Sequence, residues 1–195
     1  MAPNPSGSRS GEAQAVAAWL TDASNTGRWV VDPSATRASF QVKHFWGAMT
    51  VKGSLAGAAG EIVIGSDGSV SGQVTLQATL VDTKNAKRDA HLRSADFFKA
   101  ADHPEVALSL TSVRPTGERT LGCSALLTAA GVGTPVEFNA TVDRPNAEAI
   151  SLTAEITLDR TKLSMTWSPM GMASRTVITT VTARFVRPRE GASPA

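Results

Sequence analysis

The side chains best suited to chemistry gather in one segment, residues 82–104. It holds nine of the 36 acidic and basic residues of the chain and two of its three histidines. An imidazole beside a carboxylate is the usual general acid–base pair, so His91 with Asp89 or Asp96 defines one possible enzyme, acting on a hydrophobic substrate. The same charges could instead cap and pair within short helical turns, with Asn85 and Ser94 as helix N-caps. Both interpretations fit the residues.

Other kinds of catalytic site find little support in the sequence. His91 and His103 lie far apart, and no His-x-x-x-His, Gly-x-Ser-x-Gly or phosphate-loop pattern occurs. The single cysteine, Cys123, alternates in phase with Leu121 and Leu127, which predicts a buried and inert thiol. We therefore expect no catalytic residue, no metal site and no cofactor.

Composition narrows the class of protein further. The chain has 195 residues, of which 42% are hydrophobic, and a net charge of +2. That length corresponds to little more than one domain with a real core. Two excess charges do not make a phosphate-tracking surface, so no nucleic-acid partner is expected. No apolar run approaches the ~20 residues that a membrane-spanning helix requires.

The N-terminal region has its own pattern. Residues 1–11 are rich in Pro, Ser and Gly, which predicts a loose tail. Apolar residues at helical spacing predict a short helix over 12–23, packed on the domain or on a second copy rather than on a membrane. A basic start followed by an apolar stretch is missing, which favours a cytoplasmic protein, or a periplasmic or secreted one if a leader was removed.

From Trp29 onward the hydrophobic period becomes two, which is typical of half-buried antiparallel strands. Turn signals such as Asp67-Gly68 separate the runs, and Gly57 to Gly60 is interpreted as a further hairpin turn. We expect about eight strands, near 36–44, 48–57, 60–64 continuing at 70–80, 105–114, 119–129, 134–143, 150–159 and 175–186. Several are long, which suits a barrel or a two-sheet sandwich.

Alternation also assigns the inward faces of these strands. Eleven apolar residues are predicted to point inward, among them Val106 and Val181. The other nine are candidates for ligand contact: Phe40, Val42, Val74, Leu76, Leu108, Leu110, Phe138, Leu152 and Ile156. They could equally fill a core, because a small barrel is either packed by side chains or holds one small ligand. Small residues in phase with them, such as Ala140 and Ala154, leave volume that either collapses or holds a ligand.

A methionine- and tryptophan-rich segment follows the strand near 150–159. Met165, Trp167 and Met170 could form an adaptable apolar portal at a barrel mouth, with Trp46 on the same rim. An ordinary loop packed over the barrel end explains the same residues.

Several motifs together resemble the YceI-like family. The most specific is Arg88-Asp89-Ala90-His91-Leu92-Arg93-Ser94, preceded by Asp82-Thr83 and followed by Phe97-Phe98 and His103-Pro104. Weaker matches are Trp29 to Asp32, Phe40 to His44, Val51 to Gly53 and Asp159-Arg160. Thr161 to Ser164 depart from the family pattern, in which Phe-Gly often follows the late Asp-Arg pair.

This resemblance implies an all-β protein, an extended antiparallel eight-stranded lipocalin-like barrel, here with a short helical crossover and a short N-terminal helix. Its expected division is 1–28 tail and helix, 29–187 barrel, and 188–195 C-terminal tail. The resemblance further implies a protein, often a homodimer, that holds a long isoprenoid or similar lipid. Our leading hypothesis is therefore a non-enzymatic lipid-binding protein. We extend the expected ligand to quinone-like and fatty acyl lipids, with His91 or Arg88 near a head group. A filled interaction barrel remains a third possibility.

Overall fold

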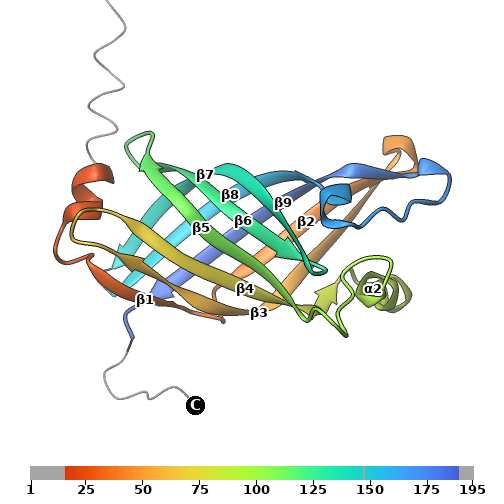
Figure 1. Ribbon diagram of the computed structural model, residues 1–195, viewed down its shortest axis with the longest axis horizontal. Helices are drawn as coiled ribbons and strands as arrows, with labels where there is room; N and C mark the ends of the chain where they lie inside the picture. The colour runs from red at the N-terminus through yellow and green to blue at the C-terminus, as the bar shows by residue number, and fades with distance from the viewer. Residues whose placement is uncertain (1–15, 147, 189–195) are drawn as a thin grey trace, which may run out of the picture.

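The computed structural model describes residues 16–146 and 148–188, which form one antiparallel sheet rolled into a barrel (Figure 1). Its strands are β1 (Gly27–Val31), β2 (Arg37–His44), β3 (Met49–Ile64), β4 (Val70–Asp82), β5 (Glu105–Pro115), β6 (Thr120–Ala129), β7 (Val132–Asn146), β8 (Ala149–Asp159) and β9 (Ala173–Val186). Their order is β1-β3-β2-β9-β8-β7-β6-β5-β4, and pairing of β3 with β4 closes the sheet.

The nine strands occupy eight positions around the barrel. Both β1 and β2 lie between β3 and β9: Trp29 pairs with Ile62 near one end of the barrel, and Phe40 pairs with Gly53 nearer the other. These two short strands therefore count as one interrupted strand of the barrel. The expected closed, eight-stranded antiparallel barrel is confirmed, and closure leaves no free sheet edge along most of its length.

The predicted hairpin turn at Gly57 to Gly60 is wrong, because β3 runs through this stretch without reversing. The register against β4 shifts between Ala56 and Ala59, and both Gly57 and Gly60 have positive φ, at 69° and 123°. A Cβ at Gly60 would lie 2.1 Å from the carbonyl oxygen of Gln73. The glycines therefore allow a bulge in one long strand, a role that glycine also takes in strand interiors.

One end of the barrel is closed by packed side chains. A short helix over residues 16–21 buries Val16 and Leu20 in the same core cluster as Trp29, whose indole is 0% exposed. The guanidinium of Arg187 lies 4.1 Å from the centroid of the Trp29 ring. This part of the predicted helix over 12–23 thus packs on the barrel. Residues 12–15 and the predicted tail over 1–11 lie outside the described residues.

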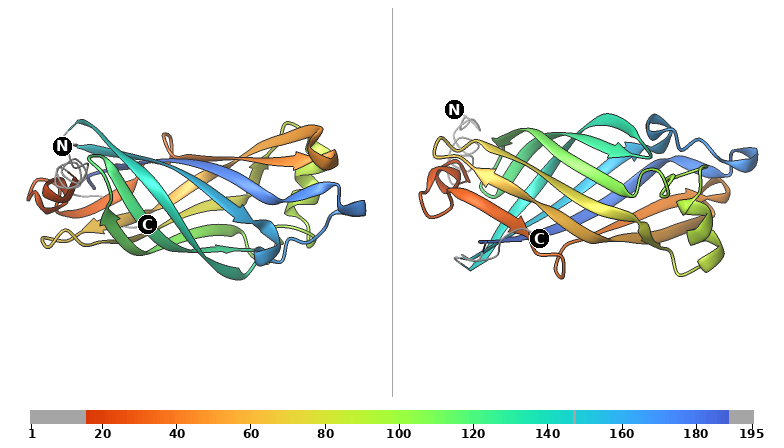
Figure 2. Two further views of the ribbon diagram at one scale, coloured as in Figure 1. Left: turned by 90° about the horizontal axis from the view of Figure 1, so that it is seen from above. Right: turned by 60° about the horizontal axis from the view of Figure 1, so that its bottom comes forward.

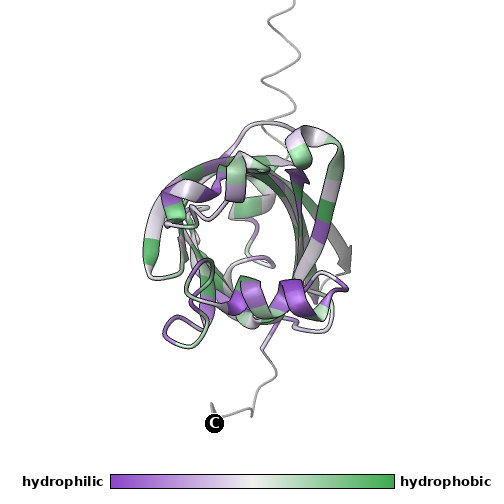
Figure 3. Ribbon diagram, turned by 90° about the vertical axis from the view of Figure 1, so that its right-hand side faces the viewer, coloured by the Kyte–Doolittle hydropathy of each residue, from purple (hydrophilic) through white to green (hydrophobic). Residues whose placement is uncertain are grey.

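The loops at the other end form the second rim of the barrel (Figures 2 and 3). They contain the 3-10 turns η1 (Phe45–Gly47), η2 (Arg160–Leu163) and η3 (Pro169–Gly171), and helix α2 (Ala86–Arg93) in the crossover from β4 to β5. We call this end the mouth. No helix in the described part of the chain is long and apolar enough to cross a membrane.

The crossover differs from its predicted form in one respect. Asn85 is the N-cap of α2, and its side chain accepts a hydrogen bond from the Arg88 N–H. Ser94 does not start a second helix. It is the C-cap of α2, with its hydroxyl donating to the carbonyl of His91. Hydrogen-bonded turns, rather than a helix, then lead to β5.

Candidate ligand-binding cavity

The barrel encloses an elongated cavity of about 320 Å³. On β9 its lining runs from Ala173 at the mouth to Phe185 near the closed end, about 40 Å along the strand. Almost all of the lining is aliphatic or aromatic. The volume lies at the lower end of the range for small-molecule sites, and the length favours a thin, extended ligand over a compact one.

Twelve of the fourteen predicted ligand-contact residues line this cavity. They are Phe40, Val42, Val74, Leu76, His91, Leu108, Leu110, Phe138, Leu152, Ile156, Met165 and Trp167. They come from five of the nine strands and from both long loops at the mouth. Period-two alternation therefore places the strand residues correctly around one interior, although contact with a ligand stays a prediction.

The other two predicted contacts, Trp46 and Met170, are outside the cavity. Trp46 is 77% exposed at the tip of η1, and Met170 is 80% exposed at the tip of η3. Each has a positive φ, 53° and 51° respectively. Period-two alternation does not extend into these turns, and their side chains are directed to solvent rather than into the barrel.

The hollow is partly explained by small inward side chains. Ala140 and Ala154 lie directly opposite each other on β7 and β8, and both line the cavity together with Ala183. Leucine at these positions would occupy much of the same space. The filled-core interpretation of the barrel is therefore wrong for its central part, although the closed end is packed.

Several lining residues were not predicted. Leu92, Phe97 and Phe98 from the crossover, and Leu163 from η2, cover the cavity near the mouth. A signal for them exists in the sequence, since these are the apolar residues within otherwise polar segments. Apolar side chains in a charged crossover need a surface to pack on, and the barrel interior provides it.

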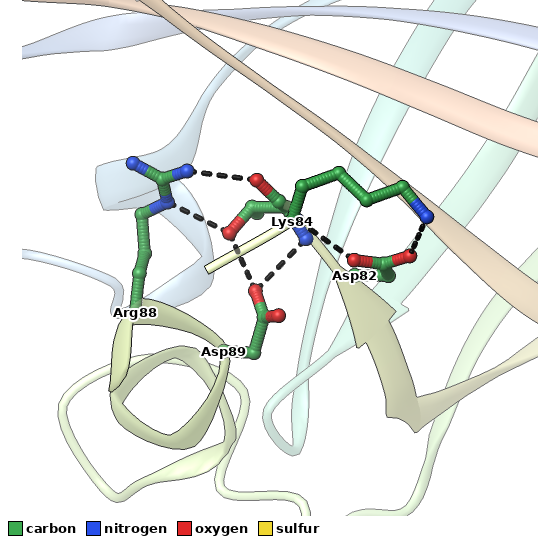
Figure 4. A network of polar contacts seen from close by, with 5 residues as sticks. Asp82, Lys84, Arg88 and Asp89 are labelled. Carbon is green, nitrogen blue, oxygen red and sulfur yellow. Dashed lines mark hydrogen bonds and ion pairs between the residues drawn. The ribbon is translucent and has the colours of Figure 1, made fainter. Parts of the chain in front are cut away.

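The local pairing of charges considered for this segment does not form between Arg88 and Asp89 or between Arg93 and Asp96. Thr83, the residue directly after β4, joins Arg88 and Asp89 instead (Figure 4). The backbone N–H and hydroxyl of Thr83 donate to the Asp89 carboxylate, while Arg88 donates to the hydroxyl and carbonyl oxygens of Thr83. Asp89 is buried, so this network fixes α2 against the barrel rather than forming an exposed ion pair.

His91 reaches across the mouth from α2. Its Nε2 lies 2.8 Å from Oδ2 of Asp96, and its ring meets Trp167 edge to face with 4.4 Å between centroids. Phe97 completes the cluster, 5.1 Å from His91 and 5.8 Å from Trp167. Of the two carboxylates considered for an acid–base pair, only Asp96 contacts His91. Aromatic side chains thus connect the two long loops over the cavity.

Arg160 holds the loop that carries Trp167. Its guanidinium is buried and donates to the backbone carbonyls of Met165, Trp167, Ala173 and Ser174. Burial lowers the pKa of this arginine, although a guanidinium stays charged at any ordinary pH. One side chain therefore ties both ends of the loop that leads from β8 to β9.

Cys123 is buried and lines the cavity. Desolvation raises the pKa of its thiol to about 11, which fits the predicted inert core cysteine. Among residues 16–146 and 148–188, no group of three or more His, Cys, Asp or Glu side chains is arranged to hold a metal ion.

These features define a class: closed antiparallel β-barrels with an elongated apolar cavity that is packed shut at one end. The chain belongs to the YceI-like family, because the model of the YceI-like domain matches residues 29–185. The expected family resemblance is confirmed.

Relatives agree with this assignment. Protein YceI of Escherichia coli O157:H7 is 45% identical over 67 residues, which span 34% of this chain and 35% of that relative. The crystal structure of Burkholderia cenocepacia BcnA is similar with a TM-score of 0.71, at 15% identity over 79% of this chain and 98% of that one. A polyisoprenoid binding domain from Saccharophagus degradans has a TM-score of 0.66, at 15% identity over 82% and 98%.

Proposed function

We propose that this protein binds and carries one long apolar lipid in its barrel: a polyisoprenoid, an isoprenoid-quinone-like molecule or a fatty acyl chain. The observation that carries the proposal is the cavity itself, which is apolar, elongated and bounded at one end by packed side chains. The structural relative from Saccharophagus degradans, described as a polyisoprenoid binding domain, supports the same ligand class.

Burial of the lipid tail supplies the affinity. Each buried CH₂ contributes ~0.8 kcal/mol, so a chain of about 15 carbons gives roughly 12 kcal/mol before costs. Association and ordering of the ligand cost on the order of 4–15 kcal/mol, so a long chain in a dry cavity is needed for tight retention. Polar groups at the mouth, His91 and Arg88, are placed to contact a head group and select among lipids.

The proposed mechanism is binding alone, without bond-making chemistry. His91 and Asp96 are adjacent, yet they also form part of the aromatic and polar closure between the two mouth loops. A homodimer and a cytoplasmic location belong to the same hypothesis and stay predictions.

A pair of variants on one strand tests the proposal. Leu108 lines the cavity, and Thr111, three residues further along β5, is exposed. Leu108→Asp places a carboxylate in an apolar cavity and should abolish binding of the fluorescent fatty acid cis-parinaric acid, whereas Thr111→Asp should bind it as the parent does. Circular dichroism checks that both variants fold. A folded Leu108→Asp protein with unchanged affinity would contradict the assigned site.

A further inference from the structure

The mouth of the barrel exposes large apolar side chains on two neighbouring loops. Phe45 and Trp46 belong to the η1 turn, and Met49 begins β3, which follows it; Trp167 and Met170 belong to the loop around η3. We call these five residues the mouth patch. Pairing of His44 on β2 with Ala173 on β9 brings the two loops side by side, and they remain at one end in every view (Figures 1 and 2). Grouped exposed apolar side chains of this size are typical of an interaction surface.

The backbone keeps the tips of the patch outward. Phe45, Trp46 and Met170 all have φ near 50°, in the left-handed region that side chains other than glycine rarely adopt. Each such residue is less stable there than in the right-handed region. The folded chain thus keeps these apolar side chains in water at a cost in free energy. Transfer of the side chains into an apolar medium would offset that cost.

The charge on the two loops that carry the mouth patch is mainly positive. Residues 43–52 and 159–175 contain five Lys and Arg but one acidic residue, Asp159. The Asp159 carboxylate accepts hydrogen bonds from the N–H and hydroxyl of Thr161. The two loops therefore carry a charge of +4, although the whole chain carries only +2. A surface that combines exposed apolar side chains with positive charge is complementary to a surface with negative groups outside and an apolar layer beneath them.

A polar hollow lies beside Met170. It is lined by Arg160 and Arg175, by the hydroxyl residues Thr161, Thr166, Ser168 and Ser174, and by Gly171 and Ala173. The lining contains two arginines, four hydroxyls and no carboxylate. Arg160 and the hydroxyls of Thr161 and Ser168 already donate to oxygens of the protein. The guanidinium of Arg175 and the hydroxyls of Thr166 and Ser174 are the donors of this lining that would hydrogen-bond phosphate oxygens.

From these observations we infer that the mouth docks on the surface of an anionic lipid bilayer, with Trp46, Phe45 and Met170 in the interface and Arg175 and Lys43 against lipid phosphates. The cavity then opens directly onto the medium that holds its ligand. This inference rests on the proposed function and adds the partner. A second copy of the chain is a poorer occupant, because two faces of charge +4 would repel each other.

Sedimentation with vesicles tests the inference on the full chain. One vesicle sample is phosphatidylcholine alone, and the other contains phosphatidylcholine with one third phosphatidylglycerol. We expect binding to the second kind only, weakened by added salt. The double variant Trp46→Ser, Met170→Ser should bind at least about tenfold more weakly, since burial of one large apolar side chain is already worth that much.

Two controls make the outcome specific. Val63 is also exposed but lies near the closed end, so Val63→Ser should sediment like the parent. Lys43→Gln with Arg175→Gln should lose the preference for phosphatidylglycerol. Equal sedimentation of the parent and of the Trp46, Met170 double variant would overturn the inference, as would a parent dimer that this double variant converts to monomer without vesicle binding.

Lipid content separates this inference from the proposed function. Mass spectrometry of the same samples reports whether lipid is held in the cavity. A parent that retains lipid but ignores anionic vesicles refutes docking and leaves the carrier intact. A parent that binds these vesicles but neither retains nor takes up lipid refutes the proposed carrier function. Docking would then not serve the transfer of a lipid into the cavity.

Discussion

The imidazole of His91 and the indole of Trp167 meet edge to face, 4.4 Å between ring centroids, and they come from different loops at the mouth. His91 belongs to α2, in the crossover between β4 and β5, and Trp167 to the segment between β8 and β9. Both side chains line the cavity. Their contact therefore joins two loops that a ligand entering or leaving the barrel must pass.

Removing this contact should speed ligand exchange. His91→Ala deletes ring contacts with Trp167 and Phe97, each worth about 0.5–1.5 kcal/mol. We expect cis-parinaric acid to leave the variant between about fivefold and about a hundredfold faster, with unchanged stoichiometry. Stopped-flow transfer of the probe to vesicles measures the rate.

Asp96→Asn is the matched control, because it alters the partner of His91 but keeps the rings. Its release rate should change less than that of His91→Ala. Identical release from His91→Ala and the parent would show that the two loops do not limit exchange.

Filling the cavity should exclude the ligand without unfolding the barrel. Ala154 lies opposite Ala140 and lines the hollow, so the ring of Ala154→Phe would enter space that a lipid needs. We expect loss of bound lipid in native mass spectra with circular dichroism unchanged. The neighbouring residue Thr153 is exposed, and Thr153→Phe should keep its lipid. A fully loaded Ala154→Phe protein would show that the ligand lies elsewhere.

Arg160 should matter for stability more than its neighbour Arg175. Loss of the buried guanidinium removes hydrogen bonds to four carbonyls around the β8–β9 loop. Arg160→Gln should lower the free energy of unfolding by about 2–3 kcal/mol, because hydrogen bonds from a charged donor are among the stronger ones. Denaturant titration of lipid-free protein measures it. The exposed Arg175→Gln should stay within about 0.5 kcal/mol of the parent. Equal stability of both variants would contradict the structural role of Arg160.

The thiol of Cys123 predicts a specific alkaline effect. Burial raises its pKa from 9.0 to about 11. Below pH 9 the thiol is protonated in both folded and unfolded chains, so pH has no effect through it. Between about pH 9 and 11 only the unfolded chain loses this proton, so stability must fall as pH rises. Comparison with Cys123→Ala cancels the other groups. The free energy of unfolding of the parent, relative to that of Cys123→Ala, should decrease between about pH 9 and 11. Parallel curves of this free energy against pH would refute a buried thiol.

Much of the interior could be predicted from sequence because a strand has a simple period. Alternation places Phe138 and Leu152 inward on β7 and β8, and the closed sheet gives all such faces one interior. Composition could not decide whether that interior is hollow. Hollowness depends on which alanines meet across strands, as Ala140 meets Ala154, and pairing between strands is a property of the register.

The turns could not be predicted in the same way. Gly57 and Gly60 are typical of a hairpin turn. However, β3 pairs with β4 both before and after these glycines, so the stretch forms a bulge within one strand. Trp46 and Met170 are residue types expected at the entrance of an apolar cavity, but the left-handed backbone at each turn directs their side chains to solvent. Arg160 stands out in the sequence only as part of a family motif, because its four carbonyl partners lie in the following loop and at the start of β9 without regular spacing.

Mass spectrometry of the purified protein, native and after organic extraction, shows whether the barrel carries a lipid. We expect one isoprenoid or fatty acyl molecule per barrel, released by extraction, or a mass shift of one lipid after incubation with prenyl quinones or fatty acids. A clean protein mass that no such lipid shifts would contradict the carrier function and leave the cavity of about 320 Å³ without its proposed ligand.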